Sequence, residues 1–273
     1  MPQTRSSPSS AIKSGCRITA LLLWSIFMTL IFGGCALLFR HKLHQIPPFF
    51  HRGCCRILGI KLRIEGELTD KCPALFVSNH ISYLDIFILG GILPGAFISK
   101  ADVAGWPLLG QMARMQNTLF IERSRRHAIS QIGQMQKRLQ NDQNLILFPE
   151  GTSTSGVDVA PFKSTLFKAA EITTSVAIQP VCINYLHSKG EKLEGTLRDA
   201  FAWYADMTFL KHFLYMAGMS GLQVKITLLE SVTFNEFGNR KLCAEYCHAM
   251  VSQTLTQNAI PQEPPPAQPF QQQ

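Results

Sequence analysis

The sequence predicts an α/β fold, in which a mostly parallel central sheet is flanked by helices and preceded by an N-terminal hydrophobic helix that associates with a membrane. Between residues 73 and 185, short apolar runs alternate with segments of helical periodicity, as in parallel sheets covered on both faces. Residues 222–228 then alternate apolar and polar side chains, as a half-buried strand does. The uncharged run at 18–39 has 22 residues, enough to cross the hydrocarbon core of a bilayer.

Residues 18–39 are expected to remain as a membrane anchor rather than to be removed as a signal peptide. Their apolar run is longer than the core of a signal peptide. Arg40 and Lys42 follow it directly, and basic residues also precede it, so the distribution of positive charge does not fix its orientation. We therefore assign a polar N-terminus to 1–17 and a membrane anchor helix to 18–44.

The rest of the chain, 45–258, is long enough to form one domain with a full hydrophobic core. Strands are predicted at five apolar runs, which are 74–77, 96–99, 118–121, 145–148 and 176–181. Helices are predicted at 163–172 and on two apolar faces, formed by Ile129, Ile132, Met135 and Leu139 and by Leu242, Cys243, Tyr246, Cys247, Met250 and Val251. The Pro- and Gln-rich tail at 259–273 is expected to be disordered.

The composition favours a membrane surface as the partner of this chain. The net charge is +8, with 46% apolar and only 16% charged residues, against a usual charged share of about 25%. A basic excess indicates a polyanionic partner, and the shortage of charge indicates burial in lipid as well as in protein. Nucleic acid is not expected, because the basic residues lack interleaved aromatic side chains and a recognisable reading element.

The eight cysteines form no recognisable metal or disulfide pattern, since no C-x-x-C pair occurs among them. Cys243, Cys247 and His248 share a helical neighbourhood, but a zinc site needs four convergent ligands. We therefore expect buried thiols in a reducing compartment and no bound metal.

The segment 78–85, Ser-Asn-His-Ile-Ser-Tyr-Leu-Asp, follows a predicted strand and opens a helix. His80 lies at the carboxyl end of that strand, where open α/β sheets bind ligands. Asp85 can hold one ring nitrogen of His80 and leave the other as a general base. Ser82 is expected to cap the helix, with Asp85 at its third position. A purely structural alternative is a capping aspartate beside a histidine with no chemical role.

Two further clusters follow predicted strand ends. In the turn 149–152, Gly151 permits a positive φ and close approach of the main chain to a phosphate or oxyanion, while Glu150 can accept a hydrogen bond from a substrate hydroxyl. Arg123, with more arginines close behind, offers forked donors for a phosphate. Singly these are an ordinary Pro-Gly turn and a solvated basic patch, but three clusters at three strand ends predict one site.

In this order the motifs resemble those of the glycerolipid acyltransferase family, which includes the lysophosphatidic acid acyltransferases. His80 and Asp85 match its His-x4-Asp catalytic motif, and Arg123 lies in its second motif. Residues 148–152 match the third motif and 176–181 the fourth. The resemblance covers residues 60–185 in all.

The resemblance implies acyl-CoA or acyl carrier protein as the acyl donor, no metal or other cofactor, and a site at the membrane surface. It assigns the binding of the acceptor and its phosphate to Arg123, Glu150 and Gly151. Three further residues are predicted to belong to the same substrate-binding set: Thr152, which follows Gly151, and Asn79 and Ser82, which lie close to His80 in the sequence.

The sequence departs from the family pattern in ways that concern the acceptor. Ser153 stands where the third motif often has arginine, Asn117 where the second commonly has glycine, and Thr165 where glycine often follows a Phe-Lys pair. Loss of that arginine weakens the case for a phosphate monoester. The stretches 161–164 and 202–207 resemble a bacterial sub-branch that includes lyso-ornithine lipid acyltransferases.

The predicted function is therefore transfer of a fatty acyl group to the free hydroxyl of lysophosphatidic acid or a related lysolipid, in phospholipid biosynthesis. The acyltransferase domain, 45–258, is expected on the cytoplasmic face of a bacterial inner membrane. One alternative is a lyso-ornithine lipid or other remodelling acyltransferase. A second, from another class, is a catalytically silent lipid-binding protein, which the fold alone permits but which His80, Asp85 and Glu150 argue against.

Overall fold

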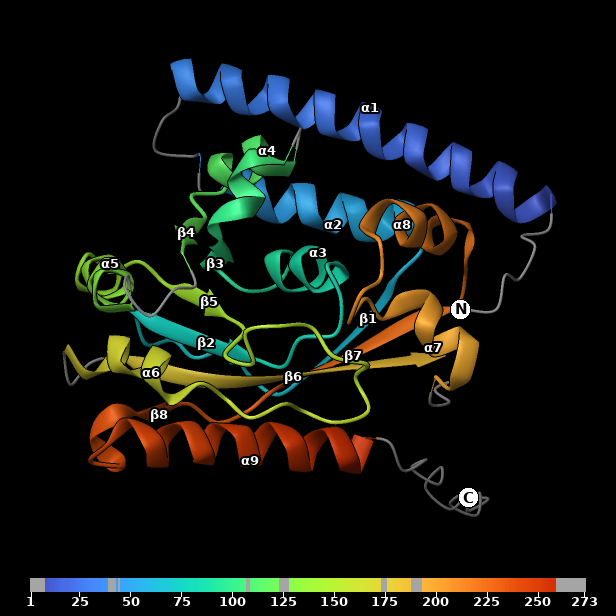
Figure 1. The fold of residues 1–273 in the computed structure, drawn as a ribbon. Coiled ribbons are helices and arrows are strands. Elements are labelled where there is room, and N and C mark those ends of the chain that lie inside the picture. The colour runs from blue at the N-terminus through green and yellow to red at the C-terminus, as the bar shows by residue number, and fades with distance from the viewer. Residues whose placement is uncertain are drawn as a thin grey trace, which may run out of the picture.

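The computed structural model describes residues 8–38, 43, 45–106, 109–122, 128–172, 176–187 and 193–258. At its centre is a sheet with the strand order β1-β7-β6-β2-β5-β3-β4, in which β8 also pairs with β6 (Figure 1). The strands are β1 (Lys61–Glu65), β2 (Ala74–Ser78), β3 (Ala96–Lys100), β4 (Leu119–Ile121), β5 (Leu145–Leu147), β6 (Ala177–His187), β7 (Leu222–Leu228) and β8 (Val232–Thr233).

Helices pack on both sides of this sheet. In chain order they are α1 (Pro8–Leu38), α2 (Ile46–Leu58), α3 (Leu84–Gly90), α4 (Leu109–Met115), α5 (Ala128–Gln140), α6 (Ser164–Phe167), α7 (Gly195–Phe201), α8 (Phe209–Gly218) and α9 (Arg240–Asn258). Short 3₁₀ turns lie at Ala101–Gly105, Lys168–Ile172 and Phe234–Glu236.

The middle of the sheet is parallel, which confirms the predicted fold class. β2 lies between β5 and β6, and β3 lies between β5 and β4, all in one direction. β7 runs antiparallel to β6, and β1 pairs in parallel with β7, so these two strands point the other way. Every residue of β2 and β5 is buried, as expected for parallel strands covered on both faces.

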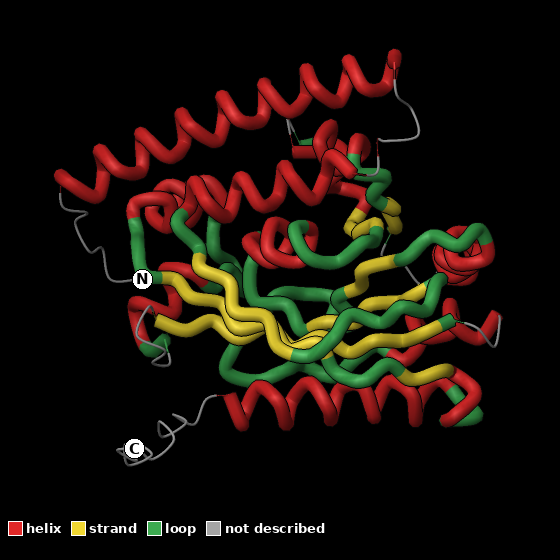
Figure 2. Tube along the Cα trace, turned by 180° about the vertical axis from the view of Figure 1, so that it is seen from behind, coloured by secondary structure: helices red, strands yellow, loops and turns green. Residues whose placement is uncertain are grey.

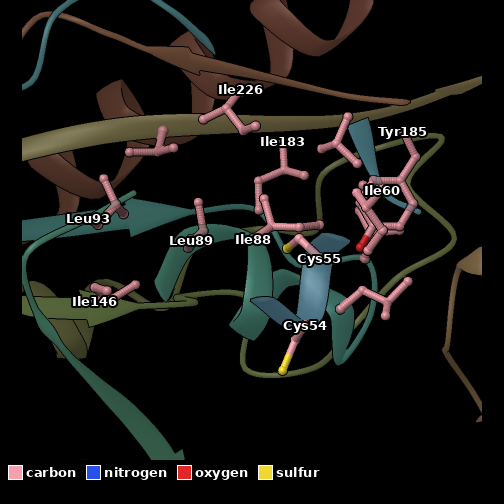
Figure 3. Packing of buried hydrophobic residues seen from close by; sticks show 14 of the residues in the cluster. Cys54, Cys55, Ile60, Ile88, Leu89, Leu93, Ile146, Ile183, Tyr185 and Ile226 are labelled. Carbon is pink, nitrogen blue, oxygen red and sulfur yellow. The ribbon is translucent and has the colours of Figure 1, made fainter. Parts of the chain in front are cut away.

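Two hydrophobic clusters hold helices to opposite faces of the sheet. On one face, Cys55 of α2 and Ile88 of α3 pack in the same cluster as Ile183 of β6 (Figure 3). On the other face, Cys247 of α9 belongs to a second cluster with Cys182 of β6. Neighbouring residues of β6 thus point to opposite faces, as the alternation of a strand requires, and the sheet is covered on both sides.

The first turns of α1 are fastened to α8. Ser14 Oγ donates a hydrogen bond to Leu214 O at 2.7 Å, and Arg17 Nη1 donates one to Ala217 O at 3.1 Å. Ala217 lies in the last turn of α8, where carbonyls lack partners within their own helix and a positive charge interacts favourably with the helix dipole. α1 begins at Pro8, within the segment 1–17 that the sequence analysis assigned as a polar N-terminus.

The apolar part of α1 lies along the domain and keeps one side exposed. Trp24 Nε1 donates to the main chain of α2 at 3.0 Å. On the outer side, Leu23, Ile26 and Leu30 are 63%, 57% and 70% exposed. Figures 1 and 2 show α1 as the outermost layer, with α2 and α8 between it and the sheet. By length and hydropathy, Ser9–Leu38 is a candidate membrane span.

Several elements differ from the sequence prediction. The helix expected at 163–172 is divided into α6 and a 3₁₀ turn. Ile129 was expected on the buried face of α5 but is 87% exposed, because Gln131, one turn before the buried Met135, takes the inward position. β1 was not predicted, since Lys61–Glu65 carries three charged side chains and is largely exposed at the edge of the sheet.

Some predictions concern parts of the chain outside the described residues. These parts include Arg40 and Lys42 after the anchor, Arg123 of the second motif and the tail 259–273. What the sequence predicts for them stays a prediction.

Candidate active site

Two loops meet at the carboxyl edge of the parallel strands. The first follows β2 and contains Asn79 and His80, and the second follows β5 and contains Glu150 and Gly151. Since β2 and β5 are neighbours and run in the same direction, their carboxyl ends lie at one edge. This is the edge at which open α/β sheets bind ligands.

His80 and Asp85 form a hydrogen-bonded pair, with 2.8 Å between His80 Nδ1 and Asp85 Oδ2. The Asp85 side chain is fully buried, whereas that of His80 is 18% exposed. The imidazole ring stacks on Phe148, with ring centroids 4.0 Å apart and planes 15° from parallel. Asp85 therefore fixes one edge of the ring, Phe148 fixes its plane, and the exposed part remains for a ligand.

The buried Asp85 carboxylate is satisfied by main-chain and tyrosine donors in addition to His80. Oδ2 accepts from the N–H groups of Ile81 at 2.7 Å and Ser82 at 3.0 Å, and Oδ1 accepts from the Tyr185 hydroxyl at 2.7 Å. An ionised carboxylate can only accept hydrogen bonds, so Nδ1 of His80 carries the proton. Nε2 then has the lone pair of the neutral ring, and no hydrogen bond to it occurs among the described residues.

The predicted capping role of the Ser82 side chain is wrong. α3 begins at Leu84, with Tyr83 before it and no side-chain cap. The Ser82 hydroxyl is buried and has no hydrogen-bond partner in the part of the chain that the structure describes. Asp85 folds back onto the N–H groups of Ile81 and Ser82 instead, so one carboxylate both closes the start of the helix and holds the histidine.

Glu150 binds the main chain of the loop that carries His80, residues 79–83 between β2 and α3, here named the catalytic loop. Its side chain is only 4% exposed, and Oε1 accepts from the His80 N–H at 2.6 Å, while Oε2 accepts from the Ala160 N–H at 2.7 Å. Burial raises the pKa of Glu150 to about 7; the two main-chain donors oppose this rise, and the charge of Asp85 adds to it. The Thr154 N–H also donates to His80 O at 2.9 Å. The loop after β5 thus holds His80 by both of its peptide groups.

Gly151 has a φ of +74°, so the turn uses the positive φ that a glycine permits at this position. A side chain here would be strained by that φ and would collide with Lys163, whose amine lies over the glycine. Thr152 next to it is exposed, and its hydroxyl makes a long 3.5 Å contact to Ser153 O. The turn therefore leaves Thr152 accessible while the glycine accommodates a cationic side chain.

Asn79 joins the catalytic loop to β6. It is 2% exposed, its Nδ2 donates to Ile183 O at 2.9 Å, and its Oδ1 accepts from the Ile183 N–H at 2.8 Å. The amide thus continues the ladder between β2 and β6 by one step after β2 has ended. Its hydrogen-bonding groups are used inside the protein, where they position His80.

Two residues that fix the loop were not found from the sequence. Tyr185 donates to Asp85, and the Trp203 N–H donates to Ile81 O at 3.0 Å. Tyr185 has a sequence signal, because it is a hydroxyl-bearing side chain at the end of an apolar strand, and a buried hydroxyl needs a partner. Trp203 has none, since the contact uses only its main chain.

Arg123 lies outside the described residues, so its relation to His80 stays a prediction. Among the described residues, no group of three histidine, cysteine or acidic side chains is placed to hold a metal ion. The cysteines are free; five are buried, whereas Cys16 and Cys72 are exposed and Cys35 is half-buried.

The arrangement can act on a proton. A histidine with one nitrogen held by a buried carboxylate and the other unbonded is equipped as a general base. No serine or cysteine of the described residues bonds Nε2, so the proton that it removes belongs to a bound molecule rather than to a protein nucleophile.

Comparisons with known proteins show the family of this chain. The Acyltransferase family matches residues 59–184. A lyso-ornithine lipid O-acyltransferase of Rhizobium meliloti is 32% identical and aligns over 81% of each chain. One from Brucella abortus is 33% identical over 82% of this chain and 86% of its own length.

Proteins named for a glycerophosphate acceptor are also similar. The 1-acyl-sn-glycerol-3-phosphate acyltransferase of Neisseria gonorrhoeae is 33% identical over 64% of this chain and 67% of its own. The crystal structure of the 1-acyl-sn-glycerophosphate acyltransferase from Thermotoga maritima superposes with a TM-score of 0.69, covering 91% of this chain and 96% of that one at 17% identity. At that identity the superposition supports the fold.

Proposed function

The chain belongs to the acyltransferase family, in the branch that acylates lysolipids, and we propose that its acceptor is lyso-ornithine lipid and its donor an acyl thioester of coenzyme A or acyl carrier protein. The relatives named for lyso-ornithine lipid support this acceptor, because two of them align over about four-fifths of this chain. Ser153 also supports it, because this serine stands where the family often has an arginine suited to a phosphate. An ornithine headgroup carries a carboxylate and an ammonium group in place of a phosphate.

The observation that carries the mechanism is the 2.8 Å bond between His80 Nδ1 and the buried Asp85. In the proposed reaction, Nε2 of His80 removes the proton of the acceptor hydroxyl as its oxygen attacks the thioester carbonyl. The tetrahedral intermediate collapses with loss of the thiolate, which takes the proton back from the imidazolium. The products are an ester and a free thiol, and Asp85 stays ionised and stabilises the imidazolium.

The remaining residues of the site are assigned to position the base. Glu150 and Asn79 hold the main chain of the catalytic loop, and Tyr185 holds Asp85. Binding of the acceptor stays assigned to Arg123 and the turn at Gly151 and Thr152, where a ligand can approach the main chain. Because positioning sets how often the base meets the hydroxyl in a reactive geometry, these groups act on turnover.

We further propose that the exposed side of α1 binds the protein to the bacterial inner membrane, with the catalytic site facing the cytoplasm that supplies the thioester. Large apolar side chains are also exposed on the two helices that pack against α1, including Phe49 of α2 and Leu210 and Leu214 of α8, which are 62%, 61% and 46% exposed. An apolar area that continues over several elements marks a membrane or protein contact, and lipid is the phase in which the acceptor lies.

The test is an acyl-transfer assay of the purified full chain with lyso-ornithine lipid and with lysophosphatidic acid, each offered with acyl-CoA and with acyl carrier protein thioesters. We expect a higher kcat/KM with lyso-ornithine lipid. A preference for lysophosphatidic acid would overturn the proposed acceptor and favour the activity named for the Neisseria relative. Binding of lysolipids without turnover of any donor would support the catalytically silent alternative.

A further inference from the structure

A polar pocket lies beside the catalytic loop, on the side of α7. It is open to solvent. Its polar lining comes from Asn184 of β6 and Arg198 of α7, and the rest of its wall includes Ile81 of the catalytic loop, Gly156 of the loop after β5 and Tyr185 of β6. One lining residue connects the pocket to the His80–Asp85 pair, because the hydroxyl of Tyr185 donates a hydrogen bond to Asp85.

Two donors in this pocket lack acceptors. Asn184 is 6% exposed, and neither its Nδ2 nor Nε of Arg198 has a hydrogen-bond partner in the described part of the protein. Arg198 forms an ion pair with Asp199, 3.7 Å from Nε, and its guanidinium also interacts with the Tyr204 hydroxyl, but Nε itself is left without a hydrogen bond. Buried donors without partners are uncommon. One of these two donors belongs to a guanidinium and both line the same pocket, which indicates an anionic acceptor as the ligand.

We propose that this pocket binds the carboxylate of the acceptor headgroup, with Arg198 and Asn184 as its donors. The inference rests on the proposed function, because it is the ornithine headgroup that brings a carboxylate to this site. A guanidinium and an amide suit a carboxylate, whose two oxygens accept charge-assisted hydrogen bonds. The exposed amine of the headgroup remains free to face solvent.

The position of the pocket fits a lysolipid that enters from α1. Two of the elements that line the pocket are β6 and α7. Figure 1 shows α1 as the outermost layer, with β6 and α7 farther from it than α2. A lysolipid with its tail toward α1 therefore directs its polar end toward Arg198. Ile81, the neighbour of His80 in the catalytic loop, lines the pocket.

The experiment compares two acceptors that differ only in the carboxylate. Lyso-ornithine lipid and its carboxyl methyl ester, presented in the same detergent micelles, share their hydroxyl and their acyl chain. For the wild-type chain we expect a KM for the free acid that is on the order of 10- to 100-fold lower than that for the ester, the range for hydrogen bonds to a charged group. Arg198→Ala and Asn184→Leu should each raise the KM for the free acid and leave that for the ester unchanged.

Controls separate this role from a structural one. Asn184→Leu removes an unpaired buried amide, so it should leave the thermal midpoint equal or higher while the preference for the free acid falls. Arg63→Ala, an exposed arginine paired with Glu65 on β1, should leave the preference intact. Equal KM values for acid and ester in the wild-type chain, or an unchanged preference in both pocket variants, would overturn the pocket but not the acceptor. Absence of turnover with either lipid would instead overturn the proposed acceptor.

Discussion

The catalytic loop and helix α1 expose opposite kinds of groups. At the loop, the buried carboxylates are paired, since Asp85 accepts from four donors and Glu150 from two. In α1, the polar contacts that bind α8 lie in the first turns, and apolar side chains such as Leu23 and Leu30 stay exposed. The geometry of the loop is thus fixed by hydrogen bonds within the protein, whereas the proposed role of α1 depends on contact with membrane lipid. Substitutions should separate turnover from membrane retention.

The largest effect on turnover is expected for His80→Ala. Removal of a general base typically lowers the rate by about 10²–10⁴-fold, and membrane retention should not change. Asp85→Asn should be less severe, because the ring remains but loses its charged partner. The measurement is kcat in detergent together with circular dichroism, and near-normal kcat in a folded His80→Ala chain would end the proposed mechanism.

Glu150→Gln tests whether this residue positions the loop or binds the acceptor. An amide can accept one main-chain N–H but not both, and an orphaned buried donor costs about 1–3 kcal/mol. If that loss falls on the transition state, kcat drops on the order of 10-fold or more, with little change in the acceptor KM. The matched control is Glu171→Gln, an exposed acid on the 3₁₀ turn. A raised KM at constant kcat would return Glu150 to acceptor binding.

The raised pKa of Glu150 predicts that the stability difference between the wild type and Glu150→Gln depends on pH. The pKa of Glu150 is raised from 4.5 to about 7, so between these values the folded chain holds a proton that the unfolded chain has lost. The free energy of unfolding of the wild type, relative to Glu150→Gln, should therefore fall as pH rises from about 4.5 to 7 and level off above that. Denaturant titrations of both proteins at several pH values measure this difference, and a flat difference would show that the carboxyl is ionised throughout.

Tyr185→Phe should lower kcat less than His80→Ala or Glu150→Gln does. It removes one donor to the Asp85 carboxylate and leaves the other three, so we expect roughly a 3- to 10-fold lower kcat, which is less than the full contribution of a hydrogen bond to a charged group. The acceptor KM should not move, because the hydroxyl faces Asp85 and not a ligand. An unchanged kcat would mean that the main-chain donors are enough to hold the carboxylate.

The smallest effect on turnover is expected on the outer side of α1. Replacement of Leu23, Ile26 and Leu30 together by serine should keep kcat in detergent within about 2-fold, since these side chains do not touch the site and distant changes add independently. Membrane retention through a high-salt wash should fall, because each buried apolar side chain contributes roughly 1.5–3 kcal/mol and salt screens what charge remains. Ile129→Ser, exposed on α5, is the control, and full retention of the triple variant would show that another surface binds the membrane.

The elements that the sequence predicts well are those with dense apolar patterns. The runs at 74–77 and 145–148 became the buried strands β2 and β5 because a parallel strand covered on both faces has few other arrangements. β1 was missed because edge strands tolerate charge. Ile129 was misplaced because the buried face of α5 includes Gln131, a polar residue that an apolar pattern does not count.

For the site, the sequence by itself determined which residue types are present at which strand ends: a histidine and an aspartate five residues apart, and an acid before a glycine of positive φ. The tertiary structure decided what each one contacts. Glu150 lies 70 residues after His80 and reaches its N–H, and Tyr185 lies 100 residues after Asp85 and donates to it. Local spacing cannot encode such contacts, because they exist only once parallel strands are brought side by side and their carboxyl ends meet at one edge.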